Sequence, residues 1–329
     1  MDNINEKSII SQENKSQLDD FENKKKKNYE FIKFMFGKVS DLRIEAMDDC
    51  GAHLQFLADA KKEKHRLKSG FFCKNRWCPY CAWRKARKDA MKLSVIMKMM
   101  REKYKYDFLF VTLTTPNVKS DDLENEIKFF NQSFMKMMKR KKIRGWGQDR
   151  RSNNFNGVVK GYVKKIEVTY NKERDDYNPH IHAVFAVRKN YFTKNYIKHE
   201  EWLDLWRDVT GMPEITQFHV QKVNMDNVDK AVLEVAKYSA KDSDYLINQE
   251  VFDTFFTAMK HKRLLVYGGC MYDYAKMFEN GELDDWKTVD STDYVYLMIA
   301  KFNYDSMRYE KRYREMSLEE QFLEKTRFL

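Results

Sequence analysis

The sequence predicts an α+β protein with a central antiparallel sheet and flanking helices. Residues 158–170 and 178–188 have strand patterns and are separated by a short turn, which is typical of an antiparallel hairpin. Segments with helical periodicity lie on both sides of this pair, at 121–144 and 226–244. One tight hairpin combined with longer helical crossovers favours an antiparallel sheet, with the hairpin strands near its centre.

The elements expected after residue 106 are a strand at 107–117, a helix at 121–144, strands at 158–170 and 178–188, a helix at 193–209, a strand at 215–223 and a helix at 226–244. Pro116 and Asn117 end the first strand. Gly211 and Pro213 end the second helix. A basic helix is expected at 83–106, ahead of the first strand.

Four regions are expected along the chain. Residues 1–45 read as a mostly disordered, basic lead-in, and residues 46–105 read as a cysteine-containing, zinc-binding module followed by a basic helix. Residues 106–246 form the predicted domain around the hairpin. Residues 247–329 read as a helical C-terminal region without a recognisable motif.

The composition favours a nucleic-acid partner. The net charge is +11, and the positive residues are clustered rather than evenly spread. An anionic membrane surface is the second choice, but no apolar run approaches the ~20 residues of a membrane span, and a membrane partner is not expected. The N-terminus has no signal-peptide core, so a cytoplasmic protein is expected, in which five cysteines favour a metal site over disulfides.

Two histidines alternate with apolar residues directly after the turn. His180 and His182 share one face of the expected strand, because side chains at i and i+2 point the same way. Together they can hold one divalent cation, Mg²⁺ or Mn²⁺, and Glu167 on the preceding strand is the best third ligand. Glu173 and Asp175 are weaker candidates because they lie in the turn. The alternative is that both histidines are ordinary strand residues.

The helix expected at 226–244 presents a tyrosine between two charges. Glu234, Tyr238 and Lys241 lie at i, i+4 and i+7, on one helical face. Tyr238 can attack a phosphodiester, with Lys241 stabilising its oxyanion, and Glu234 can act as a general base for water. Tyr245 is the competing nucleophile. The alternative is that the charges are solvated and Tyr238 packs on the sheet.

Four of the five cysteines have the spacing C-x22-C-x4-C-x2-C: Cys50, Cys73, Cys78 and Cys81. A C-x2-C turn containing Pro79 suits a tetrahedral zinc, and four thiolates make a closed, structural Zn²⁺ site. His53 or His65 could replace one ligand, and the alternative is a set of unrelated buried thiols. Cys270 lies far away and is expected to be an ordinary thiol.

Two basic runs are candidate DNA contacts, because cations beside an exposed aromatic suit phosphates and bases. Their residues are Arg84, Lys85, Arg87, Lys139, Arg140, Lys141, Lys142, Arg144 and Trp146. The alternative for each run is a solvated helix face.

These stretches together resemble a known family. Residues 110–117, 178–182 and 234–242 resemble its first, metal and tyrosine motifs, and residues 72–84 resemble its N-terminal segment. The family comprises the rolling-circle replication initiators of small Gram-positive plasmids, within the HUH endonuclease superfamily. The resemblance extends from about residue 50 to residue 245 and makes 106–246 the HUH nicking domain.

The resemblance implies metal-dependent, site- and strand-specific nicking and joining at the double-strand origin. Tyr238 would form a covalent 5′-phosphotyrosine, and Glu234 would assist the terminating cleavage. The implied partners are origin DNA with a single-stranded nick site and the host helicase and polymerase; a homodimer is compatible with this. The competing functions are a conjugative relaxase or single-strand transposase, or a non-catalytic zinc-containing DNA-binding regulator.

Overall fold

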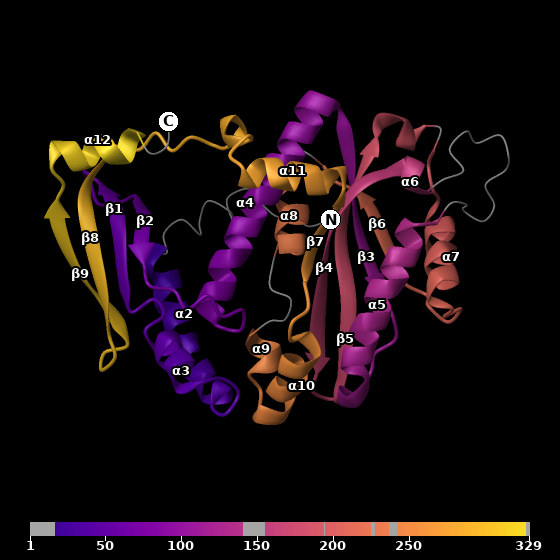
Figure 1. Cartoon of the computed structure of the whole chain (residues 1–329), viewed down its shortest axis with the longest axis horizontal. Helices are drawn as coiled ribbons and strands as arrows, with labels where there is room; N and C mark the ends of the chain where they lie inside the picture. Colours follow the sequence, from indigo (N-terminus) through magenta and orange to yellow (C-terminus); the bar gives the residue numbers. More distant parts are fainter. Residues whose placement is uncertain (1–16, 141–154, 194, 225–227, 237–241, 327–329) are drawn as a thin grey trace, which may run out of the picture. The chain divides into compact units, whose positions relative to one another are not determined.

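The structure is a computed structural model that describes residues 17–140, 155–193, 195–224, 228–236 and 242–326. The chain divides into two compact units (Figure 1). Unit 1 comprises residues 1–85 and 288–329, and unit 2 comprises residues 86–287. Both units contain an antiparallel sheet with helices, so the expected α+β class is confirmed.

The sheet of unit 2 has five strands in the order β6-β3-β5-β4-β7, and every neighbouring pair is antiparallel. The expected hairpin is β4–β5, and β5 is the central strand. The bounds of the strands are β3 Tyr106–Thr114, β4 Val159–Asn171, β5 Asp176–Arg188, β6 Phe218–Lys222 and β7 Leu265–Gly269.

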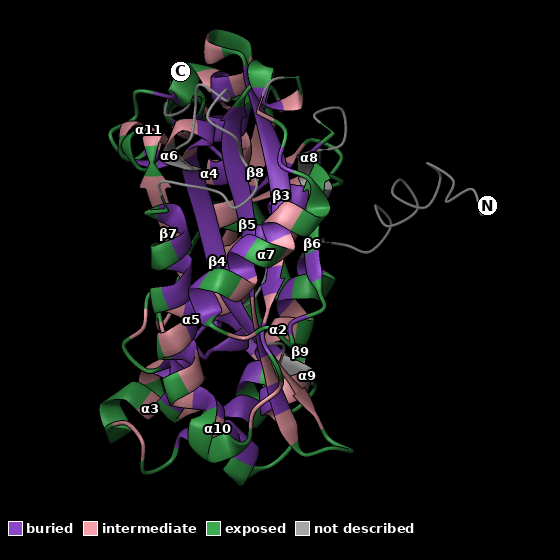
Figure 2. Ribbon diagram, turned by 90° about the vertical axis from the view of Figure 1, so that its right-hand side faces the viewer, coloured by how far each residue is buried: buried purple, intermediate pink, exposed green. Residues whose placement is uncertain are grey.

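Helices cover both faces of this sheet. Phe110, Val163 and Val184 pack on one face against residues of α4, α8 and α11. On the other face Phe185 contacts Phe134 of α5 and Trp202 of α7. Figure 2 shows buried strands behind these last two helices, whose outer surfaces are exposed. The bounds are α4 Pro79–Tyr104, η2 Ser120–Asp122, α5 Leu123–Met138, α6 Phe155–Val158, η3 Lys189–Phe192, α7 His199–Thr210, α8 Val228–Ala236, α9 Asp242–Tyr245, α10 Gln249–Met259, α11 Cys270–Glu279 and η5 Asp284–Trp286.

The sheet of unit 1 has four strands in the order β2-β1-β8-β9. Helix α2 packs on it through Phe21, whose ring centroid lies 5.1 Å from that of Phe56 on β1. The bounds are α2 Gln17–Ile32, η1 Lys33–Met35, α3 Asp41–Asp48, β1 His53–Asp59, β2 His65–Gly70, β8 Tyr294–Asn303, β9 Arg308–Glu315 and α12 Leu318–Thr326.

The expectation of a helical C-terminal region is wrong in part, since residues 247–329 also contain β7, β8 and β9. β7 completes the sheet of unit 2, and Gly268 on it leaves room for the Tyr162 ring, since a Cβ at this position would lie 2.2 Å from that ring. β8 pairs with β1, more than 230 residues earlier, and β9 is a highly charged edge strand that buries Tyr309. Charged edge strands protect a sheet from further pairing but hide its hydrophobic pattern.

The lead-in expected at 1–45 contains helix α2 and the start of α3. Its lysine run lies on α2, where Lys25 is buried and donates to the carbonyl oxygen of Asp48. Burial lowers the pKa of Lys25, and the cation also lies 5.1 Å from the centre of the Tyr304 ring. A lysine run therefore reads as disordered in the sequence although one member anchors the helix.

Several expected helices have other bounds. The helix expected at 193–209 is α7 alone, since η3 ends at Phe192, and the described part of the segment 226–244 contains α8 and α9. Unit 2 also extends beyond the expected limits 106–246, because α11 and most of α4 pack on its sheet. Within the described residues, no helix is long and apolar enough to span a membrane.

Two candidate metal centres

The register of the β4–β5 hairpin brings three potential metal ligands together. Glu167 on β4 lies directly opposite His180 on β5. His182 lies two residues further along β5 and points to the same face. Their three ligand atoms lie within 4.8 Å of one another.

The geometry of this cluster is convergent. The Nε2 atom of His182 lies 3.2 Å from a Glu167 carboxylate oxygen, and the Nε2 atom of His180 lies 3.6 Å from the same oxygen. Glu167 is buried, and both imidazoles are largely covered. Two nitrogens and one oxygen therefore face a common point at the end of a buried sheet.

The opposite side of each imidazole is held by a hydrogen bond. The Nδ1–H of His180 donates to the Asn178 carbonyl oxygen over 3.2 Å, which leaves the Nε2 lone pair facing Glu167. The Nδ1 atom of His182 lies 3.2 Å from the hydroxyl oxygen of Thr112, the residue opposite it on β3. Phe110 stacks on His182 with 5.6 Å between ring centroids. Such contacts orient imidazoles for metal binding.

The donor set fits a divalent cation. Ligand bonds of about 2.1 Å separate neighbouring ligand atoms by about 3.0–3.4 Å in octahedral or tetrahedral geometry, close to the two separations above. Two imidazoles and one carboxylate leave coordination positions for phosphate oxygens and water. Mg²⁺ and Mn²⁺ are both compatible with such a mixed set. Glu173 and Asp175 lie outside the cluster, and Asp175 instead accepts a hydrogen bond from the Tyr170 hydroxyl at 2.8 Å.

Helix α8 ends beside this cluster. The Lys165 ammonium donates to the carbonyl oxygen of Ala236, the last residue of α8, over 3.2 Å. Lys165 lies opposite His182 and two residues from Glu167, so it shares their face of the sheet. Glu234 lies in the last turn of α8 and is half-buried. Tyr238 and Lys241 lie outside the described residues.

The competing tyrosine, Tyr245, is a core residue. It is only 4% exposed, and its ring lies 6.2 Å from those of Phe252 and Phe255 on α10. A buried phenol in an aromatic cluster is poorly placed to reach a DNA strand.

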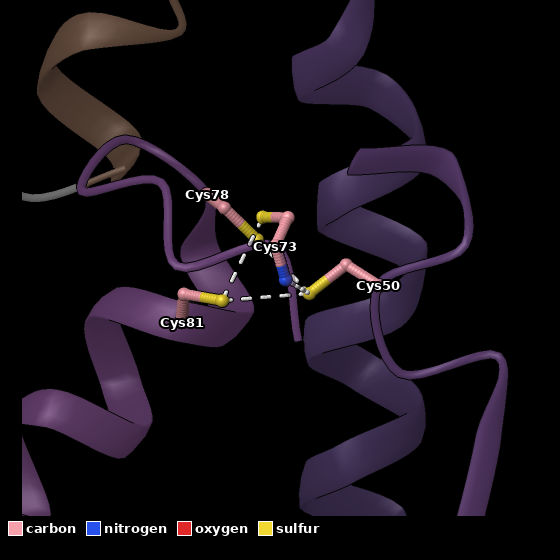
Figure 3. Close-up of side chains that lie close together, drawn as sticks. All are labelled: Cys50, Cys73, Cys78 and Cys81. Carbon is pink, nitrogen blue, oxygen red and sulfur yellow. Dashed lines mark hydrogen bonds between the residues drawn. The ribbon is translucent and has the colours of Figure 1, made fainter. Parts of the chain in front are cut away.

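The four cysteines near the N-terminus form a second cluster (Figure 3). Cys50 follows α3, Cys73 lies in the loop after β2, Cys78 directly precedes α4, and Cys81 lies in the first turn of α4. The sulfur atom of Cys50 lies 3.5 Å from that of Cys81 and 3.7 Å from that of Cys78, and the sulfur atoms of Cys73 and Cys81 are 3.7 Å apart. None of the four forms a disulfide.

These separations fit zinc. Four sulfurs bound tetrahedrally at about 2.3 Å would lie about 3.8 Å apart. Backbone N–H groups of Cys73 and Lys74 point at the Cys50 and Cys81 sulfurs, over 3.5 and 3.2 Å, which favours thiolates. Hydrogen bonds from Cys50 and the other thiols lower the pKa of Cys81, whereas burial raises the pKa of Cys78. A bound cation would allow all four to ionise.

The other residues considered for this centre lie elsewhere. His53 is exposed, and His65 has its Nε2 atom 3.2 Å from the Tyr313 hydroxyl. Cys270 is half-buried at the start of α11. The cluster of the described residues therefore consists of cysteines alone.

The candidate DNA contacts have different surroundings. The Arg84 guanidinium lies 3.4 Å from the centre of the Phe72 ring, and burial lowers its pKa. Arg140 pairs with Asp208 over 3.3 Å. Lys85, Arg87 and Lys139 are exposed, and the remaining members lie outside the described residues: Lys141, Lys142, Arg144 and Trp146.

Two residues of the site were not singled out from the sequence. Thr112 and Lys165 contact the site only through strand pairing, which a linear pattern does not reveal. His219 on β6 lies opposite Thr112 and is exposed. The alternation of the strand at 107–117 could have indicated Thr112 as a same-face residue, but not its partner.

The described residues form an α+β protein with a four-cysteine cluster that could hold a metal and a separate cluster of two histidines and one carboxylate. The sequence model of the Rep_1 family, described as replication protein, matches residues 64–314. The chain is 51% identical over 234 residues to Protein rep of Staphylococcus aureus, covering 70% of this chain and 96% of that protein. It is 32% identical over 265 residues to Protein rep of Bacillus amyloliquefaciens, covering 74% and 75%.

Protein rep of Streptococcus pneumoniae serotype 2 is 30% identical over 292 residues, covering 82% of this chain and 87% of that protein. No solved structure matches the chain. The chain belongs to the Rep_1 family and is a plasmid replication initiator.

We predict that protein purified under reducing conditions without chelators contains about one zinc per chain, as a closed four-thiolate site requires. Cys78→Ser should lower the zinc content and the unfolding temperature, because metal binding and folding are coupled. Metal analysis and thermal unfolding provide the measurements. Cys270→Ser is the matched control and should retain zinc; equal zinc loss in both variants would contradict the assignment.

We predict that Mn²⁺ binding, followed by electron paramagnetic resonance, is lost in His182→Ala and weakened about 10–100-fold in Thr112→Val, because the threonine orients the imidazole. His219→Ala removes a histidine two strands away and should leave Mn²⁺ affinity unchanged. Unaltered binding in His182→Ala would exclude this imidazole as a ligand.

Proposed function

We propose that this protein nicks and rejoins one strand at the double-strand origin of its plasmid, in a metal-dependent reaction that passes through a covalent 5′-phosphotyrosine on Tyr238. The observation that carries the proposal is the joint position of two features. The ligands His180, His182 and Glu167 converge at one end of the sheet, and Lys165 attaches the end of α8 to that same face.

The hydrogen bond between Lys165 and the end of α8 limits how far Tyr238 can lie from the metal ligands. Tyr238 is the second residue after Ala236, whose carbonyl oxygen accepts the hydrogen bond from Lys165. Two residues of extended chain span about 7 Å, so the backbone of Tyr238 lies within about that distance of the Ala236 backbone. A tyrosine side chain starting there can reach a phosphate held by the cluster. The burial of Tyr245 supports the same choice.

The chemistry assigns a task to each group. A cation held by His180, His182 and Glu167 would polarise the scissile phosphate and offset its developing charge. The Tyr238 oxygen attacks phosphorus and loses its proton, the bond to the 3′ oxygen breaks, and that oxygen takes up a proton to become a free 3′ hydroxyl. Lys241 stabilises the phenolate before attack. The free hydroxyl can then prime synthesis by the host polymerase.

Glu234 has a separate task in termination. It lies one helical turn before Tyr238 in the sequence and is half-buried near the end of α8. Its carboxylate can remove a proton from water that attacks the phosphate at the close of a replication round. Hydrolysis at this point would release the product, whereas a second tyrosine attack would continue the reaction.

We predict that Tyr238→Phe binds origin DNA normally but forms no covalent adduct, because the hydroxyl is lost and the ring is retained. The measurement is denaturing electrophoresis after incubation with supercoiled origin plasmid and Mn²⁺ or Mg²⁺. Wild-type protein should give open circles and an adduct. An adduct that persists in Tyr238→Phe and disappears in Tyr245→Phe would move the role to Tyr245, and absence of nicking by the wild type would favour a non-catalytic regulator.

We predict that Glu234→Ala retains the first nick but loses about 10²–10⁴-fold in terminating cleavage, as expected for a missing general base. The substrate is a plasmid with two origin copies, on which release of single-stranded circles should fall and multimeric products should accumulate. Glu234→Asp, which keeps the carboxylate, should recover part of the termination activity. Equal loss of both steps in Glu234→Ala would instead indicate a role in metal binding or folding.

A further inference from the structure

A hollow of about 550 Å³ lies at the end of the unit 2 sheet opposite the metal ligands. It is bounded by the turn from α4 into β3, the start of β4 and the end of β5, near α6 (Figure 1). The polar side chains that line it are Lys105, Lys160, Arg188, Lys189, Asn190 and Asn195.

The charged side chains that line this hollow are positive. Among the described residues that line it, four are cationic and none carries a carboxylate. In the part of the chain that the structure describes, no ion pair joins any of the four to an acidic side chain; Lys105 instead donates to the Glu102 carbonyl oxygen over 2.8 Å. Like charges gathered around a concave surface raise the local positive potential, which an anionic ligand would lower.

The donors suit phosphate oxygens in particular. Tyr106 lies opposite Arg188 on β3, and the Arg188 guanidinium lies 4.9 Å from the centre of the Tyr106 ring. This contact restricts the orientation of the guanidinium. A guanidinium presents a planar fork of donors that matches phosphate. Three ammonium groups and the amides of Asn190 and Asn195 add further donors.

The hollow cannot serve the phosphate that is cleaved. Arg188 lies eight residues beyond His180 on β5, which is about 27 Å at the rise of an antiparallel strand. One strand of B-form DNA would pass about eight phosphates over that distance. A phosphate bound here therefore belongs to DNA well outside the nick.

We propose that this hollow binds backbone phosphates of origin DNA at a distance from the nick site, and so adds affinity without reading sequence. The proposal rests on the proposed function in taking DNA as the substrate. The proposed phosphate-binding site uses other residues than the proposed nicking site, because none of the four cations belongs to the metal ligands or to the tyrosine helix.

The test uses the full chain with Lys160→Gln, Arg188→Gln and Lys189→Gln combined. A matched control removes three exposed lysines elsewhere in unit 2: Lys98→Gln, Lys128→Gln and Lys260→Gln. Binding to a long origin duplex is measured over a range of salt concentrations. The slope of log affinity against log salt is negative, and each lost phosphate contact should reduce its magnitude by about 0.9. We expect a decrease of about 2–3 in the hollow variant and a smaller change in the control.

A second measurement separates this inference from the proposed function. A short single-stranded oligonucleotide that carries only the nick site should be cut equally by wild type and hollow variant. Loss of that cleavage in the variant would overturn a separate site. If the variant binds the duplex more weakly but the wild type cuts no DNA, the phosphate-binding role of the hollow is supported and the proposed nicking activity is not.

Two further outcomes decide the ligand. A salt slope that is the same in the wild type and the variant overturns the inference. The inference also fails if the wild type binds ATP, the variant does not, and duplex binding is intact in both, because a free nucleotide would then be the ligand. If the triple variant has a lowered unfolding temperature, the single variant Lys189→Gln on an exposed side chain replaces it, with an expected slope change of about 0.9.

Discussion

The pairing register of β4 with β5 is the constraint on which the proposed site depends. Glu167 faces the histidines only because it lies opposite His180, and a slip of one residue would turn it to the other face. Both strands are buried along most of their length between two layers of helices, so such a slip would also expose core residues. The packing that stabilises the sheet therefore also sets the position of the ligands.

The two candidate centres differ in the number of ligands that they offer to a metal. Four cysteine sulfurs at tetrahedral separations would leave a bound zinc no position for a substrate. The cysteine cluster joins the loop after α3 to the start of α4. The histidine–carboxylate cluster has one fewer ligand and retains open positions. Thr112 and Lys165 then link it to β3 and to the helix that precedes Tyr238.

Local patterns predicted much of this arrangement. His180, His182 and the cysteine spacing are short-range signals, and Glu167 followed from the hairpin alone. What the sequence did not reveal depends on distant pairing: β8 joins β1 across the length of the chain, and charged β9 lacks an alternating apolar pattern. The contact of Lys165 with the Ala236 carbonyl oxygen also depends on distant parts of the chain, so a local pattern does not predict it.

The central claim is that the covalent bond to DNA forms on Tyr238, and peptide mapping of the adduct tests it most directly. The adduct would be digested with nuclease and trypsin and examined by mass spectrometry. Because lysines stand at 237 and 241, the account predicts that the nucleotide is carried by the four-residue peptide from Tyr238 to Lys241. A nucleotide on the neighbouring tryptic peptide, residues 242–260, which contains Tyr245, would contradict it.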